Sequence, residues 1–319
     1  MPTHAEAKDV LAGAMLEYAR SEIQAGPVAR PIQTESQRDK ATVALVGEMF
    51  PVDAITIDRL LDSLGAAAGP VVPTREWREL YAALDCKAAA MIHPFYAATA
   101  RQFRAAGRPL LGSAPVGVEG TAAWLEAMGE LLGTDRASIE AAISTQKSAI
   151  RAALDNNPID AKITLSGYEG SELLVARLLI ESGAEVAYVG SACPKTEFSA
   201  VDAKWLEAHG VSVKFRASLE DDLIAMEAFK PDLVIGTTPI VQKAKERSIP
   251  SLYFTNWISA RPLMGAAGAG SVAQVINSAL ANQPRMIAME EFFEGVGDGP
   301  TSGVWTPEII AKTGVGGTC

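Results

Sequence analysis

Short apolar runs alternate along the chain with longer stretches whose apolar residues recur at helical spacing. This alternation fills two parts of the sequence, from about Thr42 to Gly133 and from about Ala161 to Ala281. Short buried strands separated by amphipathic helices are typical of parallel sheets with helical crossovers. The pattern therefore predicts an α/β protein with two doubly wound, Rossmann- or flavodoxin-like parallel-sheet domains.

The same pattern predicts where the parts begin and end. We expect an N-terminal helix and linker over 1–40, a first α/β domain over 41–135, a connecting helix over 136–157, a second α/β domain over 158–285 and a C-terminal tail over 286–319. A lone helix followed by a linker seldom opens a domain. We therefore expect residues 1–40 to be the end of something that precedes them in a longer protein.

Eight apolar runs are expected to be strands: Val43–Val46, Ala88–Ile92, Pro109–Leu111, Lys162–Leu165, Glu185–Val189, Val211–Phe215, Leu233–Ile235 and Leu252–Phe254. Ligand sites of parallel sheets lie outside the carboxyl ends of the strands. Two such domains that face each other predict a ligand cleft between them.

Composition excludes several classes of protein. The chain has 319 residues, 48% of them hydrophobic, and 28 basic against 38 acidic residues give a net charge of −10, which argues against a nucleic-acid binder. No apolar run approaches the roughly 18–20 residues that span a bilayer. The start, MPTHAEAKDVLAGAM, lacks the basic and apolar regions of a signal peptide. Three unclustered cysteines fit a reducing cytoplasm, where we expect the protein to work.

Nucleotide, metal and hydrolase chemistry find little support. The loops after the first strands read VGEMFP and LSGYEG, and acidic Glu48 and Glu169 sit where a pyrophosphate would approach. Cys86, Cys193 and Cys319 lack metal-ligand spacing, so no metal site is predicted; Cys193 is the one candidate for a functional thiol. No Gly-x-Ser-x-Gly elbow occurs, and no catalytic residue is identified.

The expected strand-end loops are rich in aromatic residues, which favours a large, flat, mostly apolar ligand. The candidate ligand contacts are Phe50, His93, Phe95, Tyr168 and Trp257. Two other interpretations stay open. His93 can instead support the turn before Pro94, and at least half of the aromatic residues can be packing between the domains.

Three segments together carry a family resemblance: VGEMFPVDAITIDRLLDSLG, AAMIHPFYAATARQFRAAGRPLLGSAPVGVEGTAAWLEAMG and KPDLVIGTTPIVQKAKERSIPSLYFTNWISARP. They resemble the second and third domains of the nitrogenase-like oxidoreductases (component 1 type), over roughly residues 10–300. Within that family, GPVVPTREWRELYAALDC and HPFY are most similar to the Y-type subunits of chlorophyllide reductases.

The resemblance implies a catalytic-component subunit of a dark-operative chlorophyllide a reductase, which reduces the C7–C8 double bond of ring B in bacteriochlorophyll biosynthesis. It also implies a homologous Z subunit in a heterotetramer, and an X subunit, an ATP-dependent iron–sulfur protein that donates the electrons. A 4Fe–4S cluster at the Y/Z interface would relay them. Its ligands belong to an N-terminal domain that this chain does not show, so we assign none here and expect this chain alone to be inactive and to hold no cluster.

Three other functions stay open on the sequence. Two α/β lobes joined by one helix also describe small-molecule binding proteins, although no signal peptide is expected. A glycosyltransferase would need a nucleotide-phosphate site in the second domain. A scaffold that assembles a metallocofactor belongs to the same family as the reductases, and the neighbouring genes would separate the two.

Overall fold

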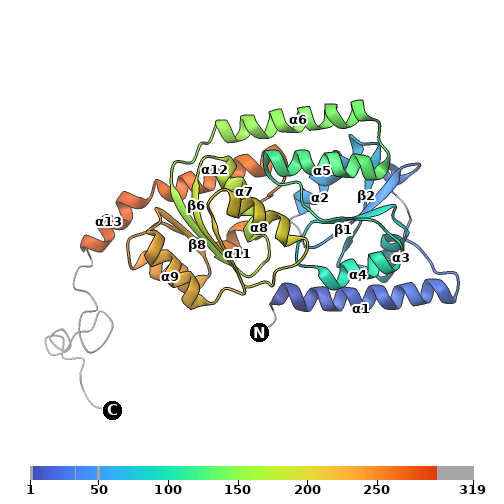
Figure 1. Cartoon of the computed structure of the whole chain (residues 1–319), viewed down its shortest axis with the longest axis horizontal. Coiled ribbons are helices and arrows are strands. Elements are labelled where there is room, and N and C mark those ends of the chain that lie inside the picture. The colour runs from blue at the N-terminus through green and yellow to red at the C-terminus, as the bar shows by residue number, and fades with distance from the viewer. Residues whose placement is uncertain (1–2, 33, 49–50, 293–319) are drawn as a thin grey trace, which may run out of the picture.

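The structure, a computed structural model, describes residues 3–32, 34–48 and 51–292. It contains two separate all-parallel sheets (Figure 1). The first has the order β2-β1-β3-β4, with β1 Ala41–Val46, β2 Ala66–Val72, β3 Ala88–Met91 and β4 Leu110–Leu111. The second has the order β7-β6-β5-β8-β9, with β5 Lys162–Gly167, β6 Glu185–Ser191, β7 Ser212–Phe215, β8 Leu233–Gly236 and β9 Ser251–Tyr253. The predicted α/β class with two parallel sheets is confirmed.

Helices cover both faces of the first sheet, because successive residues of its central strand point to opposite faces. Val43 and Leu45 pack in one cluster with residues of α2 (Pro51–Asp62) and α5 (Gly117–Leu132). Ala44 and Val46 pack in another, with residues of α3 (Trp77–Asp85) and α4 (Ala97–Ala105). Figure 1 shows α2 and α5 on one side of this sheet and α3 and α4 on the other.

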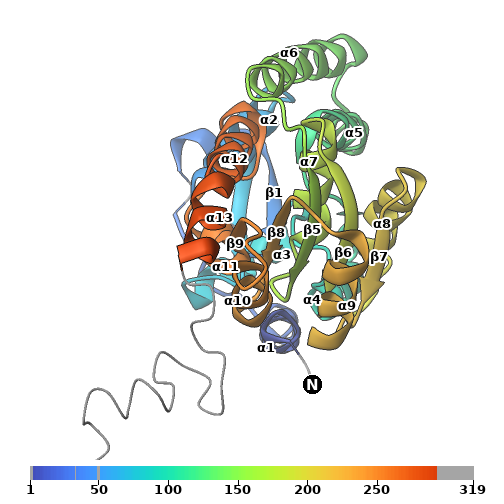
Figure 2. The ribbon, with the colours of Figure 1, turned by 90° about the vertical axis from the view of Figure 1, so that its left-hand side faces the viewer.

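The second sheet is covered in the same way. Its helices are α7 Glu172–Glu181, α8 Ser199–Ala208, α9 Leu219–Phe229, α10 Thr238–Lys245, α11 Phe254–Ser259 and α12 Gly265–Leu280, followed by α13 Gln283–Phe292. The long helix α6, Arg136–Asp155, lies outside α5 and α12 and packs on both (Figures 1 and 2). One hydrophobic cluster therefore continues from the first half into the second.

The N-terminal helix α1, His4–Ala25, packs on the first half. Its buried face, with Ala12 and Leu16, joins the cluster formed by α3 and α4. Asp9 is only 5% exposed, and its carboxylate accepts the backbone amides of Ala98 (2.7 Å) and Thr99 (2.8 Å). These amides lie in the first turn of α4, so Asp9 of one helix caps the N-terminus of another.

Strand β2 was missed by the hydrophobic pattern, which ended the first helix at Gly65 and gave no strand before Trp77. Its sequence, AAAGPVV, is made largely of residues with low strand propensity. As an edge strand it pairs only with β1, where a proline is tolerated. The helix α13 also extends into the predicted tail, of which residues 293–319 lie outside the described residues.

The two halves are joined by a buried carboxylate. Asp53, in the first turn of α2, accepts the backbone amides of Leu263 (3.0 Å) and Met264 (2.9 Å), which precede α12. Burial raises the pKa of Asp53 to about 6, although both amides act in the opposite direction. Among the described residues, every helix is too short or too polar to cross a bilayer.

Replacing Asp9 by alanine is expected to lower the free energy of unfolding by about 2 kcal/mol, because two amides of α4 lose their acceptor in a buried position. Urea unfolding followed by circular dichroism measures this change. Glu17→Ala is the matched control, since Glu17 is exposed on the same helix and carries the same charge. Equal stabilities of the two variants would contradict the capping role.

Replacing Asp53 by asparagine is expected to change how stability depends on pH. The pKa of Asp53 is about 6 in the folded protein and 3.8 ordinarily. The protonated side chain therefore contributes fully to the free energy of unfolding below pH 3.8, and this contribution is lost as the pH rises through about 6. Between pH 4 and pH 7 the stability of Asp53→Asn relative to the parent should therefore rise, by about 2 kcal/mol. A constant difference in urea unfolding across this range would contradict the expectation.

Candidate functional site

The strand orders place a ligand crevice in each half. In the first sheet the connections after β1 and β3 leave in opposite directions, so the switch point lies between these two neighbouring strands. In the second sheet the switch point lies between β5 and β8 in the same way. Ligands of such sheets bind outside the carboxyl ends of the strands at this point. In this protein the carboxyl end of β3 contacts the loop that follows β5, so the two crevices meet.

The contact is made by His93, which follows β3. Its Nε2 lies 2.5 Å from the backbone oxygen of Glu169, and only 8% of the residue is exposed. Two glycines make room for the ring. A Cβ on Gly47 would lie 2.2 Å from the Cβ of His93, and a Cβ on Gly170 would lie 2.1 Å from its Cε1. Both glycines also have positive φ, at 123° and 95°. His93 is thus enclosed by both halves.

Burial decides the charge of this imidazole. It lowers the pKa of His93 to about 4, so the ring is neutral at neutral pH. A carbonyl oxygen can only accept a hydrogen bond, so the short contact with Glu169 assigns the proton to Nε2. Nδ1 then carries a lone pair, and it has no hydrogen-bond partner among the described residues. His93 is therefore suited to positioning the β5–α7 loop and unsuited to donating a proton.

A second buried group, Glu172 in the first turn of α7, closes that loop from inside. Its carboxylate accepts the amides of Glu169 (2.8 Å) and Gly170 (3.0 Å) and the hydroxyl of Ser191 (3.1 Å). Gly167 is required beside it, because a Cβ there would lie 2.5 Å from Glu172 Oε1. In a dinucleotide-binding fold such amides hold a phosphate. Here a side chain of the protein itself accepts from these amides.

The sequence pointed to Glu169 as the charge that disfavours a pyrophosphate in this loop, but it did not identify Glu172. The carboxylate of Glu169 accepts the hydroxyl of Thr255 (3.2 Å) and keeps its negative charge. Glu48, the corresponding residue of the first half, pairs with Lys8 at 2.5 Å. The sequence did contain a signal for the role of Glu172, because a glutamate in the first turn of a helix can accept the amides of the glycine-containing loop before it.

A cavity of about 1100 Å³ opens beside His93. Its wall between the halves includes Gly47, His93, Glu169, Ser171, Thr255 and Ile258. It continues along the edge strand β2, where the wall includes Arg30, Ile32, Gly69, Val71, Arg75 and Cys86. The described wall is a mixture of small, aliphatic and charged groups, whereas the sequence suggested an aromatic lining. At this size the cavity exceeds the roughly 300–1000 Å³ of pockets for drug-sized ligands.

The five residues expected to contact a ligand are distributed differently. His93 lies on the cavity wall. Phe95 and Trp257, 2% and 6% exposed, lie in the hydrophobic core, in agreement with the interpretation as packing residues. Tyr168 is half-buried and is not on the described wall, and Phe50 lies outside the described residues. Ligand contact by these residues stays a prediction.

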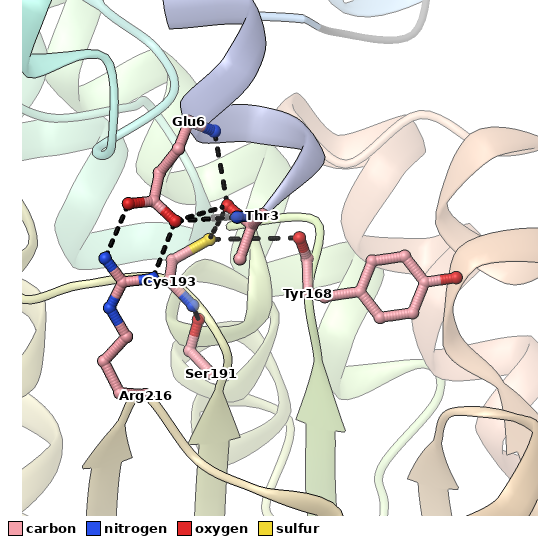
Figure 3. Close-up of polar contacts among 6 residues, drawn as sticks. All are labelled: Thr3, Glu6, Tyr168, Ser191, Cys193 and Arg216. Carbon is pink, nitrogen blue, oxygen red and sulfur yellow. Dashed lines mark hydrogen bonds and ion pairs between the residues drawn. The ribbon is translucent and has the colours of Figure 1, made fainter. Parts of the chain in front are cut away.

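Cys193 lies deep in the fold, where α1 reaches the second half (Figure 3). Its thiol donates to the carbonyl of Tyr168 (3.9 Å) and lies 3.8 Å from Thr3 Oγ1. Burial raises the pKa of this thiol to about 12, which makes it unreactive at neutral pH. The sequence suggested a functional thiol at Cys193 because this residue follows a strand. A position at the end of a strand does not show whether the side chain is buried.

The cysteines do not fit an iron–sulfur cluster held by four thiolates. Cys86 is buried in the other hydrophobic cluster, between the hydroxyl of Thr42 (3.4 Å) and the carbonyl of Ala82 (3.3 Å), and Cys319 lies outside the described residues. Over the described ranges, no group of three or more histidine, cysteine, aspartate and glutamate side chains is placed to hold a metal ion.

The helix α1 also holds the halves together by charge. The carboxylate of Glu6 accepts two hydrogen bonds from the guanidinium of Arg216, at 2.7 and 2.6 Å (Figure 3). Arg216 follows β7 and has a φ of 54°, unusual for a residue with a side chain. Since α1 packs on α3 and α4, this pair connects the first half with the strand ends of the second.

Replacing Gly170 by alanine is expected to lower the free energy of unfolding by about 3 kcal/mol, through a clash with His93 added to backbone strain. Gly133→Ala is the control, because Gly133 has a similar φ of 77° but no atom within 4 Å of its added Cβ, and it should cost about 1 kcal/mol. In a His93→Ala background the cost of Gly170→Ala should fall toward that of Gly133→Ala, although Phe95 Cδ2, at 2.7 Å from the added Cβ, keeps part of the clash. An undiminished effect of Gly170→Ala in that background would contradict the account.

Comparisons with known proteins agree on the relatives. Residues 1–281 match the family described as nitrogenase component 1 type oxidoreductase. Proteins named chlorophyllide reductase 52.5 kDa chain are 66% identical over 305 residues in Cereibacter sphaeroides and 62% identical over 311 residues in Rhodobacter capsulatus. These matches cover 96% and 97% of this chain but 60% and 62% of the relatives. The chain thus spans about three fifths of the length of the curated relatives it matches.

More distant proteins share the fold. Subunit N of the light-independent protochlorophyllide reductase of Rhodopseudomonas palustris is 23% identical over 258 residues, which cover 79% of this chain and 60% of that protein. Two solved structures of nitrogenase Cp1, at pH 6.5 and pH 5, superpose with TM-scores of 0.61 and 0.63 at 18% and 14% identity. They cover 86% of this chain and 65% and 63% of those chains. The family match spans most of the sequence, and the chain belongs to the nitrogenase component 1 type oxidoreductases.

Proposed function

We propose that this chain contributes to the catalytic component of a chlorophyllide a reductase, which reduces the C7–C8 double bond of ring B in bacteriochlorophyll biosynthesis. The observation that carries the proposal is the identity of 66% and 62% to two chlorophyllide reductase chains along almost the whole of this sequence. We place this function in the cytoplasm, where the described cysteines Cys86 and Cys193 stay free thiols.

The cavity between the halves supports a large substrate. Its volume of about 1100 Å³ leaves room for a macrocycle, and its wall at Gly47, Ile258 and Val71 offers apolar or open surface to a flat ring. The switch points of both sheets border it, as is usual for ligand sites of this architecture. We therefore assign the tetrapyrrole to this cavity, with His93 as the fixed side chain nearest to it.

The loops of this chain favour placing ATP and the cluster ligands outside its described residues. Glu172 already occupies the amides that could hold a phosphate, so the proposal places ATP on a separate iron–sulfur protein, the X subunit. The cysteines do not fit a 4Fe–4S cluster, so its ligands would come from outside the described residues. A homologous Z subunit would complete the catalytic component.

Within this proposal the chain's own residues bind and orient the pigment. The neutral ring of His93 keeps its Nε2 proton on the carbonyl of Glu169 and fixes the wall beside the cavity. Reduction of a carbon–carbon double bond takes up two electrons and two protons. With a pKa of about 4, His93 is not protonated at neutral pH and does not supply those protons.

The proposal is tested by assembling the chain with Z- and X-type partners, ATP and a reductant, and adding chlorophyllide a. We expect loss of the red chlorophyllide absorption and growth of the far-red absorption of a bacteriochlorin, dependent on this chain. Protochlorophyllide is the matched control substrate, because related reductases act on it by name. Turnover of protochlorophyllide but not of chlorophyllide, or absence of pigment binding by the assembled complex, would contradict the proposal.

A further inference from the structure

The charged side chains on the cavity wall are mostly neutralised within the protein. Arg30 donates two hydrogen bonds to the carboxylate of Asp85, at 2.7 and 3.2 Å, and both residues line the cavity. Glu48 is paired with Lys8 at 2.5 Å. Neither of these ion pairs needs a charged ligand. Glu169 accepts the hydroxyl of Thr255, which leaves its negative charge on the wall.

Glu79, the remaining acid on the wall, is also occupied. Its carboxylate accepts the backbone amides of Arg75 (3.0 Å) and Glu76 (3.3 Å), which caps the start of α3. These hydrogen bonds fix the backbone at Arg75, and they occupy the carboxylate of Glu79, the acid nearest to it in the sequence on this wall. The guanidinium of Arg75 therefore gains no ion pair from Glu79.

Arg75 is thus the one charged side chain on the described wall for which the described residues provide no partner. It is exposed, and it lies in the loop between β2 and α3. The protein as a whole carries a net charge of −10, so an unpaired cation beside this cavity is not the result of a generally basic surface. A guanidinium in this setting has free donors for a planar anion.

We propose that Arg75 binds the carboxylate of the ligand that occupies this cavity. The inference rests on the proposed function, because chlorophyllide a carries one free propionate carboxylate on an otherwise apolar macrocycle. Arginine binds carboxylates through two parallel hydrogen bonds, which fix direction as well as distance. The propionate then lies at the first half, next to the β2–α3 loop, and the ring extends toward His93.

The acidic group on the opposite wall favours the same orientation. Glu169 belongs to the loop after β5 of the second half. A propionate placed against that loop would meet like charge, whereas the β2–α3 loop offers Arg75. Arg75 would therefore determine both the selection of the free acid and the direction in which the macrocycle enters.

The test compares chlorophyllide a with its methyl ester, which has the same ring but no carboxylate. The assembled complex, with the parent chain or with Arg75→Gln, is titrated with each pigment. We expect the parent to bind the acid about tenfold more tightly than the ester, and Arg75→Gln to bind both alike. Arg75→Lys should keep part of the preference, since it retains the charge but not the planar donors.

Arg78→Gln is the matched control, because Arg78 is exposed three residues further on and lies outside the described wall. It should keep the full preference for the acid, and unfolding midpoints should be equal for the three arginine variants. An unchanged preference in Arg75→Gln, or no preference in the parent, would overturn the role of Arg75 while leaving the proposed function intact. Binding of neither pigment would instead overturn the proposed function, and this inference with it.

Discussion

The close approach of the two sheets at His93 is the constraint on which the rest of the structure depends. The Cβ and backbone of His93 occupy space that a side chain at position 47 would fill, and its imidazole occupies the space at position 170. The one hydrogen bond of the imidazole crosses from the first half to the second. This contact fixes where the carboxyl ends of the strands lie, and the cavity forms beside it. Because both glycines have positive φ, any other residue at position 47 or 170 would be strained as well as crowded.

Around this contact the protein uses its own carboxylates where related architectures bind anionic ligands. Glu172 satisfies the amides of the β5–α7 loop, and Asp53 satisfies the amides before α12. Burial raises the pKa of both acids, so each is retained at some cost to stability at neutral pH. In return the loops are fixed without a nucleotide. A wall held in this way leaves the cavity available for a ligand of a different kind.

The sequence was sufficient for most of the fold but for little of the site. Strands such as Lys162–Gly167 could be predicted because apolar runs between glycines report burial directly. The edge strand at Ala66–Val72 could not, since its small residues carry no such signal. At the site, a strand-end position identified His93 but gave the same weight to Phe95, which is core. The roles of Glu172 and Arg75 depend on which partners other segments provide or withhold, and a local pattern does not contain that information.

The central claim is that the space between the two halves is a tetrapyrrole site oriented by groups of this chain. The most direct measurement is an electron cryo-microscopy map of the assembled complex with chlorophyllide a bound. The account predicts density for the macrocycle in the cavity bounded by Gly47, His93 and Thr255, on the carboxyl side of both sheets. Density for the pigment elsewhere, with this cavity filled by side chains or solvent, would contradict it.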